Sequence, residues 1–298
     1  MSYGAEASTG ELVALVPEFW DNEIEKFRYE KSVMLNRVTT KTGKIKGYGD
    51  TLRMFIKGRY TATAVTESTG AFTVQEYTPT EVDLLIDQHF VVAIETVNRA
   101  TKQSIWDPKS SVADEATSAF AVEYDRDLLA LGSTIGTIGT VANPKVFNLE
   151  MARAMYIRLA KRNIPRSELS FVLPVEGIYD GLYKQVEVTD ASKIGLPKSV
   201  LSTGYIMPLL GVPVYETNLA QKPTGAANST ALQALLFHKS AYAIGMQLNN
   251  HYEEASNLSA GRLAKTVAID SLWGTIRFRG DHAVVGLVKE YIETQEDQ

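Results

Sequence analysis

The chain has 298 residues and a formal net charge of −5, with 45% hydrophobic residues, 22% charged residues and no cysteine. This composition is typical of a globular protein that can bury one large core or two smaller ones. The acidic balance disfavours a nucleic-acid binder that relies on overall positive charge. The lack of cysteine excludes disulfides, thiolate nucleophiles and thiolate zinc sites. No signal peptide or membrane-spanning run is expected.

The N-terminal region is expected to be a polar arm followed by a helix. Residues 1–11 are small and polar, and Pro17 suits the first position of a helix. Trp20, Ile24 and Phe27 would line one face of this helix, and the opposite face is densely charged. That charged face either contacts solvent or meets a neighbouring subunit.

A long two-stranded ribbon is predicted after a glycine-rich, basic connector at 41–50. Residues 51–65 have the alternating side-chain pattern of a strand and are rich in β-branched side chains. Residues 66–72 would form a turn, and residues 72–86 would form the returning strand. A two-stranded ribbon is not stable alone in water. It must therefore lie either on its own domain or on another copy of the chain. The second is favoured, because few of its residues could join a core.

The middle of the chain is predicted to be helical. Residues 91–102 are expected to form one helix, and residues 110–132 a longer one that spans roughly 30 Å. Ser110 or Ser111 would cap the longer helix after Pro108, and Gly132 would end it in a left-handed conformation. Its apolar side chains recur every four residues: Val112, Ala116, Phe120, Tyr124 and Leu128.

The second half of the chain predicts an α/β segment. A flexible connector precedes Asn148, which would cap a helix that ends at Asn163. Further elements are expected at 170–175 (strand), 177–187 (short helix), 211–217, 231–237 and 241–247 (strands), and 262–288 (strand formers with a turn at 280–281). Loop-rich stretches separate them at 188–208 and 222–230.

Catalytic motifs are missing from the sequence. It contains no G-x-x-x-x-G-K, G-x-G-x-x-G, G-x-S-x-G or H-E-x-x-H pattern. Glu81, Asp83 and Asp87 alternate along the returning strand, so they would either bind a hard cation or form a solvent-facing row. We favour the row, and we expect no catalytic, cofactor or metal site.

Two other polar groups have alternative interpretations. His251, Glu253 and Glu254 would hold a metal only with a distant third ligand, and a solvated polar loop is favoured. The basic residues of the outgoing strand would contact either nucleic acid or an acidic neighbour, and no aromatic platform accompanies them. We favour charge pairing for these residues, which are Arg53, Lys57 and Arg59.

The order of these elements and several stretches of sequence resemble the major capsid proteins of tailed bacteriophages, which have the Hong Kong 97-type fold. These stretches are PEFWDNEIEKF, YGDTLRMFIKGRYTATAV, FTVQEYTPTEVDLLIDQHF, ALLFHKSAYAIGMQ and AKTVAIDSLWGTIRFRGDHAVVGL. The resemblance covers most of the chain. It rests on the order of the elements and on the general character of these stretches rather than on a short motif.

The resemblance implies an α+β capsid fold with an extended β-hairpin loop, a long spine helix in a peripheral domain, and an α/β axial domain. The implied division is 1–42 (arm and helix), 43–86 (extended loop), 87–144 (peripheral domain with the spine helix), 145–230 (axial domain) and 231–298 (return strands that complete both domains). The stretch 188–208 would be the axial loop.

The implied function is non-enzymatic: a coat protein that assembles as hexamers and pentamers into an icosahedral shell around phage double-stranded DNA. Its partners would be other copies, a separate scaffolding protein, a portal protein and a decoration protein, with no membrane. Assembly in the host cytoplasm would lead to the virion. One alternative is an encapsulin-like nanocompartment shell of the same fold. A third hypothesis, from another class, is a hydrolase-like or cation-dependent enzyme that uses Glu81, Asp83 and Asp87.

Two departures from relatives affect these expectations. Some relatives begin with a long scaffolding segment, and the arm here is short, which implies a separate scaffolding protein or a trimmed chain. Some relatives form covalent Lys–Asn cross-links. Lys57 lies in the ribbon and Asn249 and Asn250 in the return, but no spacing pairs them, so no cross-link is expected.

Overall fold

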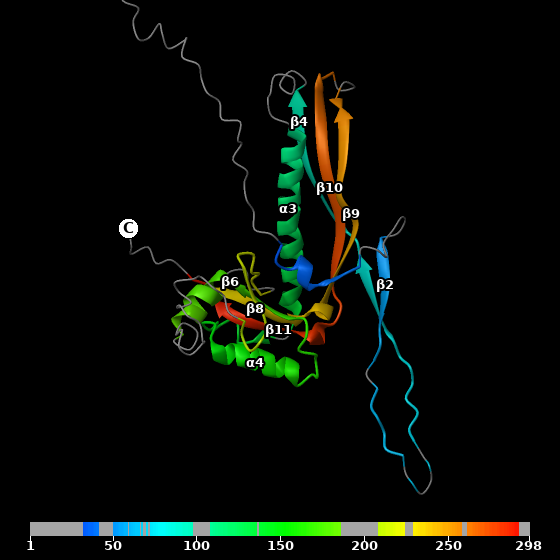
Figure 1. The fold of residues 1–298 in the computed structure, drawn as a ribbon, viewed down its shortest axis with the longest axis vertical. Helices are drawn as coiled ribbons and strands as arrows, with labels where there is room; N and C mark the ends of the chain where they lie inside the picture. The colour runs from blue at the N-terminus through cyan, green and yellow to red at the C-terminus, as the bar shows by residue number, and fades with distance from the viewer. Residues whose placement is uncertain are drawn as a thin grey trace, which may run out of the picture.

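The computed structural model describes residues 32–41, 50–58, 60–65, 67, 70, 72–97, 108–135, 137–185, 208–223, 229–257 and 261–291. Two lobes and a projecting ribbon make up this part of the chain (Figure 1). Its helices are α3 (Pro108–Ala130) and α4 (Leu149–Ala160). Its strands are β1 (Thr39–Thr40), β2 (Thr51–Ile56), β3 (Thr80–Leu85), β4 (Gln88–Val97), β5 (Thr137–Ile138), β6 (Leu169–Pro174), β7 (Val214–Thr217), β8 (Ala231–His238), β9 (Tyr242–Ser256), β10 (Ala264–Arg277) and β11 (Ala283–Lys289).

The first lobe packs the long helix α3 along a four-stranded sheet with the order β1-β9-β10-β4 (Figure 1). β10 pairs antiparallel with both β4 and β9, while β1 pairs parallel with β9. Trp273 of β10 is fully buried, stacks on Phe90 with the ring centroids 4.9 Å apart, and meets Tyr124 of α3 edge-on at 4.6 Å. The Trp273 indole N–H also donates to Asp127 of α3 at 2.8 Å. This aromatic contact fixes the helix against the sheet.

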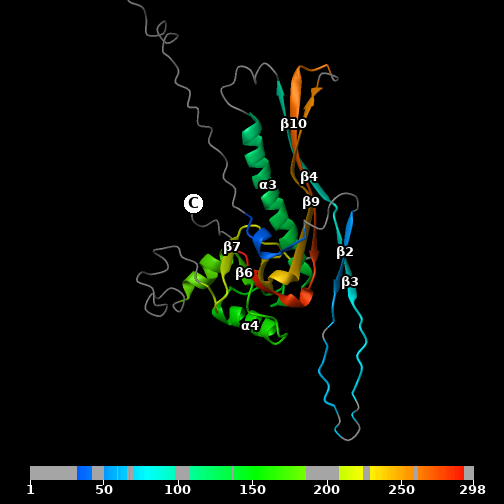
Figure 2. The same ribbon diagram turned by 45° about the vertical axis from the view of Figure 1, so that its right-hand side comes forward.

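The second lobe is a five-stranded sheet with the order β5-β11-β8-β6-β7, with α4 against it (Figure 2). Every residue of β6 and β8 is buried, as expected for central strands covered on both faces. α4 buries Met151, Ala152, Met155 and Leu159. The Asn148 side chain accepts a hydrogen bond from the Met151 N–H at 2.8 Å, which confirms the predicted cap.

The long helix agrees with the prediction in its position and buried face. α3 begins at Pro108 rather than after it, and Ala116, Phe120, Tyr124 and Leu128 are buried. The predicted left-handed end at Gly132 is wrong, because Gly132 lies in a 3-10 turn and has no positive φ. A Cβ on Gly132 would lie 2.8 Å from Gln233 Oε1 and 2.8 Å from Leu235 Cδ2. Glycine is therefore needed here for close packing against β8.

The predicted helix at 91–102 is also wrong, because its first part belongs to strand β4. Residues of β4 alternate strictly between half-buried and exposed, and Phe90, Val92 and Ile94 pack against the core of the first lobe. This two-residue period is that of a sheet with one covered face. The β-branched residues of VVAIETV favour the strand.

Other predicted elements differ in length. Within the predicted helix at 177–187, the described residues form a π turn at Gly177–Gly181 and a 3-10 turn at Leu182–Lys184. β9 continues nine residues beyond the predicted end at Gln247, through a polar stretch that pairs with β10. The arm helix from Pro17 and nearly all of the loop 188–208 lie outside the described residues. None of the helices among the described residues has the length and apolarity needed to cross a membrane.

The root of the ribbon passes very close to β10. A Cβ on Gly274 would lie 1.9 Å from the Leu85 carbonyl oxygen and 3.0 Å from the Ile86 Cα. Leu84 and Ile86 are buried, and the Ile86 N–H donates to the Asp50 carbonyl at 2.7 Å. Only glycine lets the backbone of the ribbon cross β10 at this distance.

We therefore expect Gly274→Ala to lower the free energy of unfolding by about 1–3 kcal/mol, because the added methyl forces Leu85 to move. Urea denaturation of the purified chain measures this change. Gly58→Ala is the matched control, because its Cβ would meet only the Thr78 carbonyl at 3.9 Å. Equal stability of the two variants would contradict the proposed close contact.

Candidate functional site

The ribbon projects from the first lobe and is the main candidate site (Figures 1 and 2). β2 and β3 pair over six residue pairs, from Thr51↔Leu85 to Ile56↔Thr80. Beyond them the two arms remain extended, and the Gln75 side chain bonds both backbone groups of Thr61. The predicted strand pair is confirmed at its root, and it is shorter than the sequence predicted.

The two faces of the paired root differ in chemistry. Leu52, Met54 and Val82 are half-buried on one face, together with the buried Leu84. The other face carries Arg53 directly opposite Asp83, with the Arg53 Nε–Asp83 Oδ1 distance at 3.1 Å. Arg53 also pairs with Glu81, and its hydrogen bond to Asp83 and the charges of both carboxylates raise its pKa. This agrees with the predicted charge pairing.

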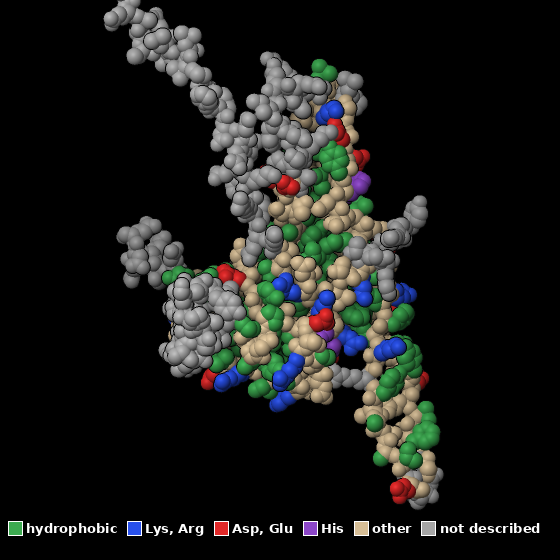
Figure 3. Space-filling view, in the orientation of Figure 1, with side chains coloured by type: hydrophobic (Ala, Val, Ile, Leu, Met, Phe, Trp, Pro, Cys, Tyr) green, Lys and Arg blue, Asp and Glu red, His purple; other side chains and the backbone are tan. Residues whose placement is uncertain are grey.

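Large apolar side chains are exposed along the ribbon (Figure 3). Val74 is 81% exposed, Phe72 68% and Phe55 60%, although hydrophobic side chains of this size are usually buried. Tyr60, Val65 and Tyr77 are exposed as well. The exposure of several large apolar side chains on one projecting segment makes the ribbon a candidate site of contact with another molecule.

The candidate cation site is not assembled in the ribbon. Glu81 and Asp83 both form ion pairs with Arg53, and Asp87 accepts a hydrogen bond from the Gln88 side chain at 3.1 Å. Within the described part of the chain, no group of three or more His, Cys, Asp or Glu residues is arranged to hold a metal ion. Lys57 is exposed, and Arg59 lies outside the described residues.

The residues of the second candidate metal group pair with other side chains instead of forming one site. His251 lies 3.0 Å from Asp270, whose second carboxylate oxygen lies 2.9 Å from His89. Burial favours a higher pKa for Asp270, but the bonds from both histidines lower it overall. Glu254 instead pairs with Lys265 at 2.8 Å. These residues lie on strands β4, β9 and β10 rather than on the predicted polar loop.

Asn250 does not approach the ribbon. Its side-chain amide donates to Thr117 Oγ1 of α3 at 3.0 Å.

A structural contact that the sequence did not predict holds residues 32–34, at the end of the arm, on α3. The buried Asp125 carboxylate accepts three hydrogen bonds: from Ser32 Oγ at 2.5 Å, from the Val33 N–H at 2.6 Å and from the Met34 N–H at 3.0 Å. Burial raises the Asp125 pKa, and these bonds oppose the rise. The sequence signal for this contact is a carboxylate next to the apolar stripe of α3. It does not identify the partners, because they lie more than 90 positions earlier in the chain.

We expect Asp125→Asn to lower the free energy of unfolding by about 1–3 kcal/mol, because the amide NH2 would face the Val33 N–H and leave a buried donor without an acceptor. Amide hydrogen exchange should accelerate at Val33 and Met34. The exposed Glu115→Gln on the same helix is the control. Unchanged exchange at both amides in Asp125→Asn would contradict this anchoring role.

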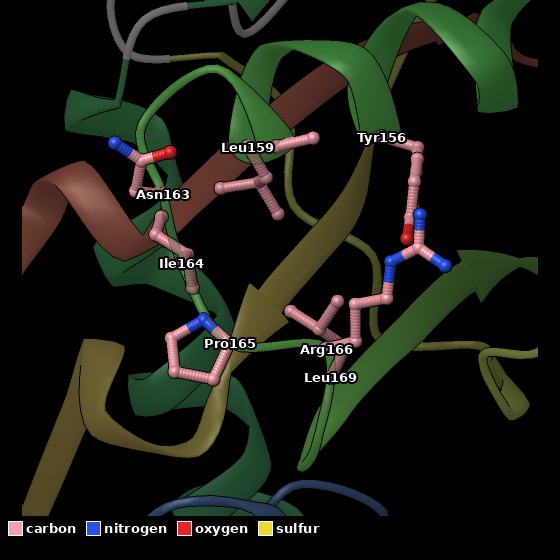
Figure 4. Close-up of a pocket in the computed structure, with 8 residues that line it drawn as sticks. Tyr156, Leu159, Asn163, Ile164, Pro165, Arg166 and Leu169 are labelled. Atoms are coloured by element: carbon pink, nitrogen blue, oxygen red, sulfur yellow. The ribbon is translucent and has the colours of Figure 1, made fainter.

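A pocket of about 450 Å³ lies at the end of α4 (Figure 4). The Arg166 guanidinium lies over the Tyr156 ring, 5.3 Å from its centroid. Arg166 is the one charged side chain among the eight lining residues, which are Tyr156, Leu159, Ala160, Asn163, Ile164, Pro165, Arg166 and Leu169. This lining has no acid–base pair for catalysis.

Known structures match this chain over nearly its whole length. A chain from the structure of Mycobacterium phage Che8 matches with a TM-score of 0.73 and 19% identity, over 91% of this chain and 96% of that chain. A chain of the capsid of cyanophage P-SCSP1u matches with a TM-score of 0.72 and 15% identity, over 96% of each chain. A chain of the mature capsid of bacteriophage PhiM1 matches with a TM-score of 0.71 and 10% identity, over 98% of each chain.

The sequence matches no protein-family model and no curated protein. The structural similarity establishes the fold: the chain has the α+β, Hong Kong 97-type fold of phage capsid subunits, as the sequence predicted.

Proposed function

We propose that the chain is the major capsid protein of a tailed phage, which assembles as hexamers and pentamers into an icosahedral shell around double-stranded DNA. The observation that carries the proposal is a capsid fold with a projecting ribbon whose large apolar side chains are exposed. A ribbon of this kind is not stable in water unless another surface covers it. Another copy of the chain supplies that surface in a closed shell with rotational symmetry.

The proposed division of the chain follows the sequence. Residues 43–86 are the loop that lies on the neighbouring subunit, 87–144 contain the spine helix, and 145–230 form the axial domain, with 188–208 at the symmetry axes. Residues 231–298 complete both domains, and residues 1–42 form the arm. A separate scaffolding protein, a portal protein and a decoration protein are the proposed partners. Assembly takes place in the host cytoplasm and leads to the virion.

The proposal gives the chain no enzymatic role. The pairing of Glu81 and Asp83 with Arg53 supports this, because a cation-dependent enzyme would need those carboxylates for the metal. Their position on an exposed ribbon also supports it, because ligand and substrate sites are usually concave pockets rather than projecting segments.

Electron microscopy of the purified chain, together with light-scattering mass, tests the proposal directly. We expect closed icosahedral shells, formed by the chain alone or after addition of a candidate scaffolding protein. Packaged DNA in particles from infected cells supports a phage capsid, whereas an enclosed enzyme indicates a nanocompartment. Particles that stay near the monomer mass of 32.8 kDa with every scaffold candidate would contradict shell assembly.

Shortening the ribbon should separate folding from assembly. Replacing residues 57–79 by Asn-Gly keeps the last cross-strand pair, Ile56↔Thr80, and closes it with a favourable two-residue turn. We expect a folded monomer that melts within about 2–4 °C of the wild type, because the described residues of the removed segment are exposed. No shells should form.

A milder pair of variants tests the apolar side chains alone. Phe72→Ser with Val74→Ser should reduce the yield of shells, while Thr73→Ser, a conservative change on the same stretch, should preserve it. Normal shell yield from both the shortened ribbon and the double variant would show that the ribbon is not an assembly contact.

A further inference from the structure

The chain crosses from one lobe to the other at two places, and each crossing passes through a short turn that lies next to the other. β8 continues through the 3-10 turn Lys239–Ala241 into β9, and β10 continues through the 3-10 turn Gly280–His282 into β11. The Arg279 N–H donates to the Ala241 carbonyl at 3.0 Å, which joins the two crossings. A change at this point acts on both sheets, since each crossing belongs to one sheet before its turn and to the other after it.

A single hydroxyl lies between two histidines at this junction. Ser240 Oγ is 2.8 Å from His238 Nδ1 and 2.7 Å from His282 Nδ1. The two imidazole rings meet edge-on, with centroids 5.7 Å apart. Both histidines are more than nine-tenths buried. Ser240 therefore links the first turn to the second.

The backbone determines which atoms carry the protons. The Ser240 N–H donates to His238 Nδ1 at 3.1 Å, so this nitrogen carries no hydrogen and His238 is neutral, with its proton on Nε2. The Ser240 hydroxyl must then donate to the same nitrogen. Ser240 Oγ in turn accepts from His282 Nδ1–H. The Nε2 of His282 lies 3.7 Å from the Asp281 carboxylate.

The charged groups around His238 come from several elements. Glu168, just before β6, accepts the Lys239 N–H through its backbone carbonyl at 3.1 Å, and its carboxylate lies 4.0 Å from the Lys239 ammonium. Burial lowers the His238 pKa, and the Glu168 charge partly offsets this.

The second turn brings charged groups from α4 and β10. Arg162 of α4 donates to the backbone carbonyls of Asp281 at 2.6 Å and Ala283 at 3.3 Å. The Arg277 side chain of β10 lies against Gly280, and Arg279 follows β10 directly. This side of the junction therefore already carries several positive charges.

We propose that His238 is an acid-sensitive switch at the junction of the two lobes: neutral His238 accepts the Ser240 N–H and joins the turns, and protonated His238 gives up this bond. A proton on Nδ1 occupies the lone pair that accepts from Ser240, so the N–H loses its acceptor and the hydroxyl can stay in contact only by accepting instead of donating. The proton also places a positive charge beside His282. The switch belongs to the folded subunit and operates whether or not the chain assembles into shells.

The direction of the pH dependence follows from the lowered pKa. A histidine whose pKa is lower in the folded state binds its proton more readily when the site opens. Its stabilising contribution is complete above the ordinary pKa of about 6.5 and decreases as the pH falls from there towards the folded-state value. Each unit by which the pKa is lowered corresponds to about a tenfold change in the opening equilibrium.

His238→Asn gives a sharp test. The Asn Oδ1 can accept the Ser240 N–H two residues along, as in an Asx turn, but it does not titrate. Amide hydrogen exchange of the full-length chain, corrected for intrinsic rates, is compared at about pH 7.5 and about pH 5.5, on either side of the ordinary histidine pKa. We expect the wild type to lose protection at lower pH in peptides that cover residues 238–242 and 279–284. His238→Asn should not lose it.

His251→Asn is the matched control, because His251 is exposed on β9 and bonds Asp270. It should lose protection at the two turns as the wild type does. Equal loss in His238→Asn and the wild type would overturn the proposal, and so would a wild type without any loss. Should His238→Asn not fold, ¹⁵N-histidine NMR of the wild type decides: Nε2–H on His238 with titration below the ordinary range supports the switch, and Nδ1–H or ordinary titration overturns it.

Discussion

The packing of Trp273 against α3 is the contact on which the rest of the first lobe depends. Its ring is fully buried between Phe90 and Tyr124, and its N–H is bonded to Asp127. The next residue, Gly274, is the one that lets the Leu85 carbonyl approach the backbone of β10. Two successive residues of one strand therefore position the long helix and the root of the ribbon. The direction in which the ribbon leaves the body follows from this pair.

Much of the fold could be predicted because its signals are local. The helix α3 has a four-residue apolar repeat, and α4 has an Asn cap. At the root of the ribbon, apolar side chains alternate with charged ones, and the charged ones pair across the two strands. The sequence of β4 predicts a helix, because a short apolar run does not distinguish the helical period from the strand period well. The polar half of β9 has no such signal, since pairing with β10 rather than burial makes it a strand.

The interactions that join distant parts of the chain could not be predicted from local pattern. Asp125 contacts residues more than 90 positions earlier, and Ser240 contacts His282 across 42 positions. In a sequence, such residues look like ordinary polar side chains. Only the sheet topology, which brings two crossings into contact, shows that a serine and two histidines form one network. The same holds for Gly274, whose role depends on a carbonyl from another strand.

The sheet order has a consequence for how the chain is made. The first lobe pairs β1 with β9 and β4 with β10. Residues 39–40 and 88–97 therefore cannot pair until the strands that begin at 242 and 264 have been synthesised. The second lobe likewise needs β11, the last strand before the C-terminal residues. Contacts this distant in sequence slow folding, because long loops must close before the contacts form. Neither lobe can therefore be completed on a nascent chain that ends before β10 and β11, whose last residue is Lys289.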